Sequence, residues 1–135
     1  MIYLLDSNVC IQLLNGRHRG LIDCFHRHDP QDIVLCSMVK GELRRGALRS
    51  QRIELNLQRL ESFFAPLKSL PFDDTAAEHY ARIGADLSRR GAPIGPNDLI
   101  IAATALAHNA TLITHNTGEF GRVQGLRMED WEVAL

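Results

Sequence analysis

The chain has 135 residues, of which 45% are hydrophobic and 23% are charged, and its 15 Lys and Arg against 16 Asp and Glu give a net charge of −1. This size and composition predict one globular domain over residues 1–135 and exclude a disordered or fibrous chain. A near-neutral balance provides no overall field that would attract a nucleic acid or a membrane surface. Any nucleic-acid binding must therefore depend on locally clustered charge.

The cysteines and the apolar segments indicate where such a protein would reside. Cys10, Cys24 and Cys36 form no C-x-x-C pair and no zinc-type spacing, so neither a disulfide framework nor a structural metal is indicated. The N-terminal residues lack the pattern of a signal peptide, and the apolar stretch at 99–107 is far shorter than the roughly 18 residues of a membrane span. We expect a cytoplasmic protein with no membrane partner.

Short β-prone runs alternate with amphipathic stretches along the chain. In chain order we expect a strand at 2–5, a helix at 9–14, a strand at 33–36, helices at 38–48 and 53–64, a strand at 67–72, helices at 76–90 and 98–108, a strand at 111–114, and a short fifth strand within 126–131. This alternation predicts a three-layer α/β/α sandwich around a mostly parallel sheet of four to five strands. Functional groups in such a sheet gather at the carboxyl ends of the strands.

Three acidic residues fall where this architecture forms sites. Asp6 ends the first strand, Glu42 lies in the helix after the second strand, and Asp98 opens the most apolar helix. A helix cap or a solvated helix face is the ordinary alternative for each of them. Ser7 or Asn8 is expected to cap the first helix, which leaves Asp6 free, and Ser37 is expected to cap the helix at 38–48. Asp98 shares a helix side with apolar residues, so its charge needs a cation or a proton.

The segment after the fourth strand, THNTGEF at 114–120, adds further candidates. Asn116 and Glu119 reach the same pocket if the fourth strand lies beside the first. Turn residues in such a segment need no special role, and His115 is either an assistant in proton transfer or an incidental loop residue.

Carboxylates that converge from separate elements repel one another unless a cation lies between them. Oxygen ligands without His or Cys partners favour Mg²⁺, for which Mn²⁺ can substitute. Such an ion lowers the pKa of a bound water and neutralises charge on a scissile phosphate. The pattern therefore predicts phosphodiester hydrolysis, and it leaves open whether one metal or two is used.

Five segments together resemble a known family. They are YLLDSN at 3–8, SMVKGELRRGA at 37–47, GAPIGPND at 91–98, THNTGEF at 114–120 and GLRMEDW at 125–131. Each is weak alone, but their order and spacing resemble the PIN-domain ribonucleases, in particular the VapC toxins of bacterial type II toxin–antitoxin pairs. The resemblance covers nearly the whole chain.

The resemblance implies roles for individual residues. Asp6, Glu42 and Asp98 would be the acidic metal-binding residues, and Ser7 would support the site by hydrogen bonding. Many members carry a fourth acid where this chain has Asn116. The resemblance places Asn116 with the catalytic residues, because its carbonyl oxygen can still bind a water or a metal, but the lost charge should weaken a second metal, with Glu119 as the alternative ligand.

The resemblance also implies partners. They are a second copy of the chain in a homodimer, a VapB-like antitoxin that can join it in a larger assembly, and a structured RNA substrate such as initiator tRNA. Antitoxins of this kind lay a segment over a groove of the toxin. Ile11, Leu14, Phe63 and Phe64 are candidates for that groove, with a place in the core as the alternative for each.

Residues 38–59 form the densest positive stretch, with six basic and two acidic side chains. Lys40, Arg44 and Arg45 lie within about a turn of Glu42, and we expect them to bind RNA phosphates that an acidic site would otherwise repel. A solvated helix face is the alternative.

Other functions fit less well. A catalytically weak RNA- or partner-binding PIN module is supported by the missing fourth acid. An aspartyl-phosphate phosphatase would need a second Asp where Asn8 stands, and a receiver domain would need an acidic pair at the first strand. A dinucleotide-binding role lacks a G-x-G-x-x-G segment after the first strand.

Overall fold

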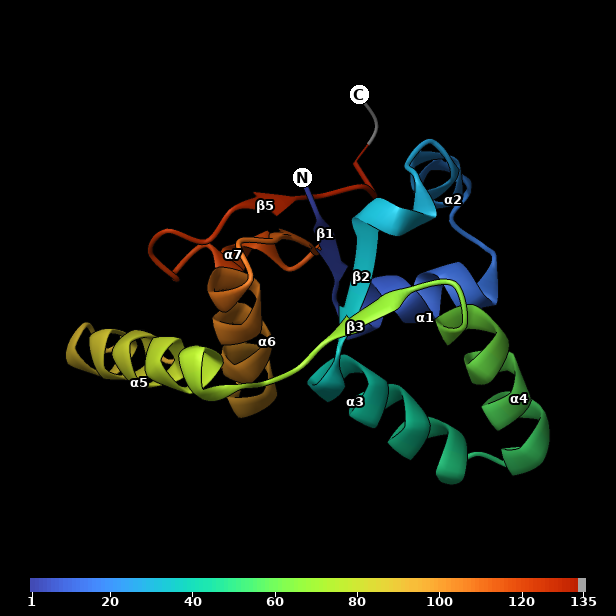
Figure 1. The fold of residues 1–135 in the computed structure, drawn as a ribbon, viewed down its shortest axis with the longest axis horizontal. Helices are drawn as coiled ribbons and strands as arrows, with labels where there is room; N and C mark the ends of the chain where they lie inside the picture. Colours follow the sequence, from blue (N-terminus) through green and yellow to red (C-terminus); the bar gives the residue numbers. More distant parts are fainter. Residues whose placement is uncertain (134–135) are drawn as a thin grey trace.

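The computed structural model describes residues 1–133 (Figure 1). The elements in chain order are β1 (Tyr3–Leu5), α1 (Ser7–Asn15), α2 (Arg19–His26), the short 3₁₀ helix η1 (Pro30–Asp32), β2 (Ile33–Cys36), α3 (Ser37–Leu48), α4 (Ile53–Phe64), β3 (Lys68–Leu70), α5 (Asp74–Arg89), α6 (Pro96–Ala107), β4 (Thr111–Ile113), α7 (Thr117–Phe120) and β5 (Met128–Glu129). None of the helices within this described range is long and apolar enough to cross a membrane.

The five strands form one parallel sheet in the order β3-β2-β1-β4-β5. β1 is central, with Leu4 paired to Val34 on one side and to Leu112 on the other. Because all strands run in the same direction, their carboxyl ends lie at one edge of the sheet. The prediction of an α/β/α fold with a mostly parallel sheet of four to five strands is confirmed.

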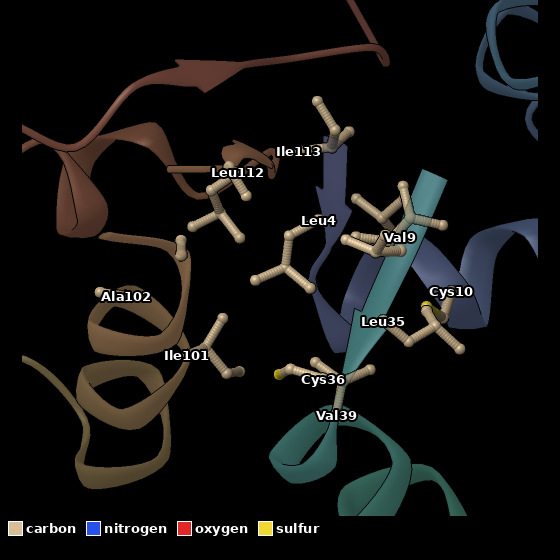
Figure 2. Packing of buried hydrophobic residues seen from close by; sticks show 14 of the residues in the cluster. Leu4, Val9, Cys10, Leu35, Cys36, Val39, Ile101, Ala102, Leu112 and Ile113 are labelled. Carbon is tan, nitrogen blue, oxygen red and sulfur yellow. The ribbon is translucent and has the colours of Figure 1, made fainter. Parts of the chain in front are cut away.

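Helices cover both faces of the sheet, as the near-continuous apolar strands require. Figure 2 shows Leu4 and Leu112 directed toward Ile101 of α6, whereas Leu35 lies with Cys10 of α1 on the opposite side. Successive strand residues point to opposite faces, so these short strands supply both halves of the core. The sheet is therefore fixed by packing on two sides, and this packing holds its carboxyl edge in place.

Two of the expected helix caps are wrong. Asp6 itself caps α1, because its Oδ1 accepts a hydrogen bond from the backbone N–H of Val9 at 2.9 Å, and Ser7 is already inside the helix. Cys36 occupies the N-cap position of α3, which leaves Ser37 as the first helical residue. In both places the strand runs into the helix one residue earlier than the capping chemistry suggested.

The structure also contains elements that sequence patterns did not predict. α2 is one, and its N-cap is His18, whose Nδ1 accepts from the backbone N–H of Leu21 at 3.0 Å. Histidine is outside the usual set of capping residues, and Leu21 is the one buried residue of this helix. η1 and α7 are too short to give a periodic signal.

Candidate active site

The carboxyl edge of the sheet carries four of the predicted acids. Asp6 follows β1 directly, and Glu42 lies in α3, which begins where β2 ends. Asp98 lies in the first turn of α6, and Glu119 lies in α7 a few residues after β4. β1 lies between β2 and β4 in the sheet, so their carboxyl ends bring these separate elements together.

Asp6 is buried at the centre of this edge, with 5% of its surface exposed. Burial raises the pKa of its carboxyl, while hydrogen bonds from Thr114 and the backbone of Val9 oppose that shift. Glu132 and Glu42 raise the pKa further through their negative charges. Asp6 is thus both a helix cap and a member of an acidic group, so the two interpretations of this residue are compatible.

Neutral donors hold both oxygens of Glu42. The Ser7 hydroxyl donates to Oε1 at 2.5 Å, and the Asn97 side-chain amide donates to Oε2 at 3.2 Å. One donor comes from α1 and the other from α6, so the carboxylate connects the three helices that surround the site. Its orientation is therefore fixed before any ligand binds.

Asp98 and Glu119 shift each other's pKa values. Burial, the charge and proximity of Glu119, and the charges of Glu42 and Asp6 raise the pKa of Asp98 to about 7. The pKa of Glu119 is lowered instead, chiefly because the Gly95 backbone N–H donates to its Oε1 at 2.7 Å. Asp98 therefore holds the proton of the pair, and the two carboxylates repel each other whenever both are ionised.

Asn116 contacts Glu119 directly. Its side-chain amide donates to Glu119 Oε2 at 2.6 Å, and its backbone N–H donates to Thr114 Oγ1 at 3.0 Å. Both oxygens of Glu119 thus receive hydrogen bonds, one from Asn116 and one from Gly95. In this arrangement Glu119 provides the fourth carboxylate, and Asn116 orients it.

Asp6, Glu42, Asp98 and Glu119 offer only oxygen atoms as ligands. Hard divalent cations such as Mg²⁺ prefer oxygen ligands, so the chemistry of these four side chains suits such an ion. Within the part of the chain that the structure describes, no three of Asp6, Glu42, Asp98 and Glu119 bring one ligand atom each within 4.8 Å of the others.

A second group at this edge does reach that separation. One ligand atom each from His115, Asp130 and Glu132 lies within 4.8 Å of the others. Asp130 and Glu132 were not predicted, since the only sequence signal was that they follow the two-residue strand β5. The His115 Nδ1–H donates to Asp130 Oδ2 at 2.9 Å.

Of the three predicted basic residues, two contact α4 and one is exposed on α3. Arg44 donates to Glu61 Oε1 at 2.9 Å and lies 5.1 Å from the ring centre of Phe64, as does the amine of Lys40. These contacts connect α3 to α4 and give Arg44 a structural role beside any RNA contact. Arg45 is exposed on the same helix.

An apolar groove of about 210 Å³ lies between α1, α3 and α4 next to Glu42. Ile11 and Leu14 line it, as the sequence suggested. Phe64 belongs to the core instead, with 4% of its surface exposed, and Phe63 packs against that core.

The sequence was compared with known protein families and with individual known proteins. Residues 3–126 match the PIN domain family. The chain belongs to the PIN-domain family. It is 37% identical over 129 residues to the tRNA(fMet)-specific endonuclease VapC of Shigella flexneri, covering 96% of this chain and 97% of that protein. It is 34% identical over 135 residues to ribonuclease VapC2 of Rickettsia felis, covering 98% and 99%.

The fold of this chain also matches that of solved structures. A chain of the DNA-bound VapBC from Salmonella typhimurium superposes with a TM-score of 0.91 at 34% identity, covering 97% of this chain and 98% of that chain. The resemblance to VapC-type PIN domains seen in the sequence is confirmed. This PIN domain is a nuclease of the VapC type.

Proposed function

We propose that this chain, as a single PIN domain over residues 1–135, is a metal-dependent endoribonuclease toxin that cuts phosphodiester bonds in structured RNA. The observation that carries the proposal is the Asp98–Glu119 pair. Burial and the charges of Glu119, Glu42 and Asp6 raise the pKa of Asp98 to about 7, so this carboxyl holds a proton at the carboxyl edge of the sheet. A bound divalent cation would replace that proton and relieve the repulsion.

Asp6, Glu42, Asp98 and Glu119 would hold the cation, with Mg²⁺ as the expected ion and Mn²⁺ as a substitute. Such an ion supplies an activated water and neutralises charge on the scissile phosphate. The protein contributes pre-orientation: Ser7 and Asn97 fix Glu42, while Gly95 and Asn116 fix Glu119. These contacts support a role for Asn116 as a positioning residue.

We propose tRNA, such as initiator tRNA, as the substrate. The relative from Shigella flexneri carries the name tRNA(fMet)-specific endonuclease, and the similarity extends over nearly the full length of both chains. Arg45 and its neighbours on α3 offer positive charge on the helix that carries Glu42, which suits an RNA backbone.

We also propose a VapB-like antitoxin, a homodimer that joins it in a larger assembly, and action in the cytoplasm. The related chain from Salmonella typhimurium was solved as part of VapBC. Glu42 lines the groove together with Ile11, Leu14 and Leu43, so a segment lying in it would contact one carboxylate of the acidic site. This placement supports inhibition by direct coverage of the site.

The proposal is tested by cleavage of a panel of tRNAs and unstructured RNAs with Mg²⁺, with Mn²⁺ and with a chelator. The wild-type protein and Asp98→Asn are compared, with Glu78→Gln as a matched control because Glu78 is exposed on α5 and far in sequence from the site. We expect discrete, metal-dependent tRNA products from the wild type and Glu78→Gln, and RNA binding without cleavage from Asp98→Asn.

Cleavage that survives chelation, or identical products from Asp98→Asn, would contradict the proposal. RNA binding by the wild type without any cleavage would support a catalytically weak binding module instead. A preference for unstructured RNA over every tRNA would overturn the proposed substrate and leave the nuclease activity standing.

A further inference from the structure

The His115, Asp130 and Glu132 side chains gather at the carboxyl ends of the two strands β4 and β5. His115 follows β4 after one residue, and Asp130 follows β5 directly. One ligand atom from each of the three lies within 4.8 Å of the other two. A site with metal–ligand bonds of about 2.1 Å separates neighbouring ligand atoms by roughly 3–3.5 Å, so only small side-chain movements would close this group on an ion.

Neighbouring contacts hold the two acidic residues in place. The backbone N–H of Glu132 donates to Asp130 Oδ1 at 2.9 Å, while Asp130 Oδ2 lies 2.9 Å from His115 Nδ1. Trp131, between them, is buried and stacks on the His28 ring at 4.3 Å between centres. The buried indole anchors the segment, so the cluster rests on a packed base.

The other side of the cluster is open. The side chain of His115 is 64% exposed, whereas that of Asp130 is 16% exposed. Asp130 and Glu132 also line a cavity of about 910 Å³ between α2 and the segment after β5. An ion can therefore reach Asp130 and Glu132 through this cavity and His115 directly from solvent.

The charge around this cavity favours a cation. Its lining contains the four carboxylates Asp23, Glu129, Asp130 and Glu132 and one arginine, Arg27. The negative charge of Glu132 also reaches Asp6 and raises the pKa of that carboxyl. A cation bound here would therefore offset negative charge that the neighbouring side chains leave uncompensated.

The donor chemistry separates this cluster from the Asp6–Glu42–Asp98–Glu119 group. Its imidazole nitrogen is a ligand that Zn²⁺, Mn²⁺ and other transition metals accept readily, whereas Mg²⁺ prefers oxygen ligands and retained water. We propose that His115, Asp130 and Glu132 form a second divalent-cation site, selective for transition metals over Mg²⁺. Three protein ligands leave coordination positions for water or a phosphate oxygen.

The test is a titration of the purified protein with Co²⁺ in the presence of excess Mg²⁺. Binding is measured by calorimetry and by the visible absorption of bound Co²⁺. The proteins compared are the wild type, Asp98→Asn, His115→Ala and Asp130→Asn, with His26→Ala as the control for an exposed histidine elsewhere. His115 is exposed, so its removal leaves the fold intact, which circular dichroism checks.

We expect one Co²⁺ per chain to bind in the wild type, in His26→Ala and in Asp98→Asn. Changes outside the ligand shell alone typically weaken metal binding 10–100-fold, so His115→Ala and Asp130→Asn should weaken it by at least about 100-fold. Mn²⁺ should broaden the imidazole NMR signals of His115 in the wild type before those of His26.

Co²⁺ affinity that is equal in His115→Ala and the wild type would overturn the second site, and so would the absence of any binding in excess Mg²⁺. If Asp98→Asn abolishes Co²⁺ binding while His115→Ala retains it, the ion belongs to the four-carboxylate group. That result would refute the second site and leave the proposed nuclease function intact.

Discussion

The two sides of the acidic edge hold their carboxylates in different ways. Glu42 receives hydrogen bonds from two neutral donors, the Ser7 hydroxyl and the Asn97 amide. Asp98 faces another carboxylate, Glu119, and its pKa is raised to about 7 by burial and by that neighbour. The first arrangement is complete without a ligand, whereas the second needs a proton or a cation. Under the proposed function, the contrast predicts that a metal ion acts mainly on the Asp98–Glu119 side.

Replacement of Glu119 should have the largest effect on this side. Glu119→Gln keeps the shape but removes the charge, and we expect cleavage of tRNA to fall by at least about 100-fold, because a charged ligand near a metal contributes several kcal/mol. Asn116→Ala removes one of two hydrogen bonds to Glu119 and should cost only about tenfold. Single-turnover cleavage rates measure both. A larger loss in Asn116→Ala than in Glu119→Gln would reverse the roles assigned to these residues.

The proton on Asp98 should make the stability of the metal-free protein depend on pH. A carboxyl whose folded pKa is raised from 3.8 to about 7 contributes its full stability below pH 3.8 and loses it as the pH rises to about 7. Solvent screens this half-buried group, so the loss should be about 1–2 kcal/mol. Urea unfolding with a chelator present, at pH 4.5 and pH 8, measures it.

Asp98→Asn provides the control for this pH dependence. The amide cannot ionise, so the variant should lose less stability than the wild type between the two pH values. An identical pH dependence in the two proteins would show that Asp98 is not the group that holds the proton.

On the Glu42 side, Ser7→Ala should lower cleavage by about tenfold. The variant removes one of the two hydrogen bonds that orient the carboxylate, and a hydrogen bond to a charged group contributes about 1.5–3 kcal/mol. Ser62→Ala, at an exposed position of α4, serves as the matched control and should leave the rate unchanged. A rate in Ser7→Ala equal to that of the wild type would show that Glu42 needs no fixed orientation.

The smallest effects should come from the basic residues of α3. Arg44→Ala loses the contacts with Glu61 and Phe64 and should cost about 0.5–1 kcal/mol of stability. Arg45→Ala should leave stability unchanged but weaken tRNA binding and reduce its salt dependence. Thermal unfolding and filter binding at several salt concentrations separate the two. Unchanged tRNA affinity and cleavage in the Arg44→Ala/Arg45→Ala double variant would rule out an RNA role for both.

The alternation of apolar strands and amphipathic helices was sufficient to predict the order of the main elements. α4 begins and ends at the residues expected from its periodicity, and β2 does the same. α2 was missed because a histidine caps it and only Leu21 is buried in it. Apolar periodicity reports burial, so a helix with one buried residue gives little signal.

The positions of Asp6, Glu42 and Asp98 could be inferred because strand ends and helix starts are visible in the sequence. The relation between Asn116 and Glu119 could not, since it depends on a four-residue helix that turns both side chains toward each other. The cap at Asp6 was misjudged because Ser7 and Asn8 are equally good capping residues, and only the structure shows which residue ends the strand.

Under the proposed function, the Asp98–Glu119 pair binds a divalent cation. Mn²⁺ binding by calorimetry tests it most directly, measured in a His115→Ala background so that the proposed second site contributes nothing. We predict one or two Mn²⁺ ions per chain, displaced by Mg²⁺, and a loss of at least about tenfold in affinity when Asp98→Asn is added. Equal Mn²⁺ affinity with and without Asp98→Asn would show that Asp98 does not hold the cation.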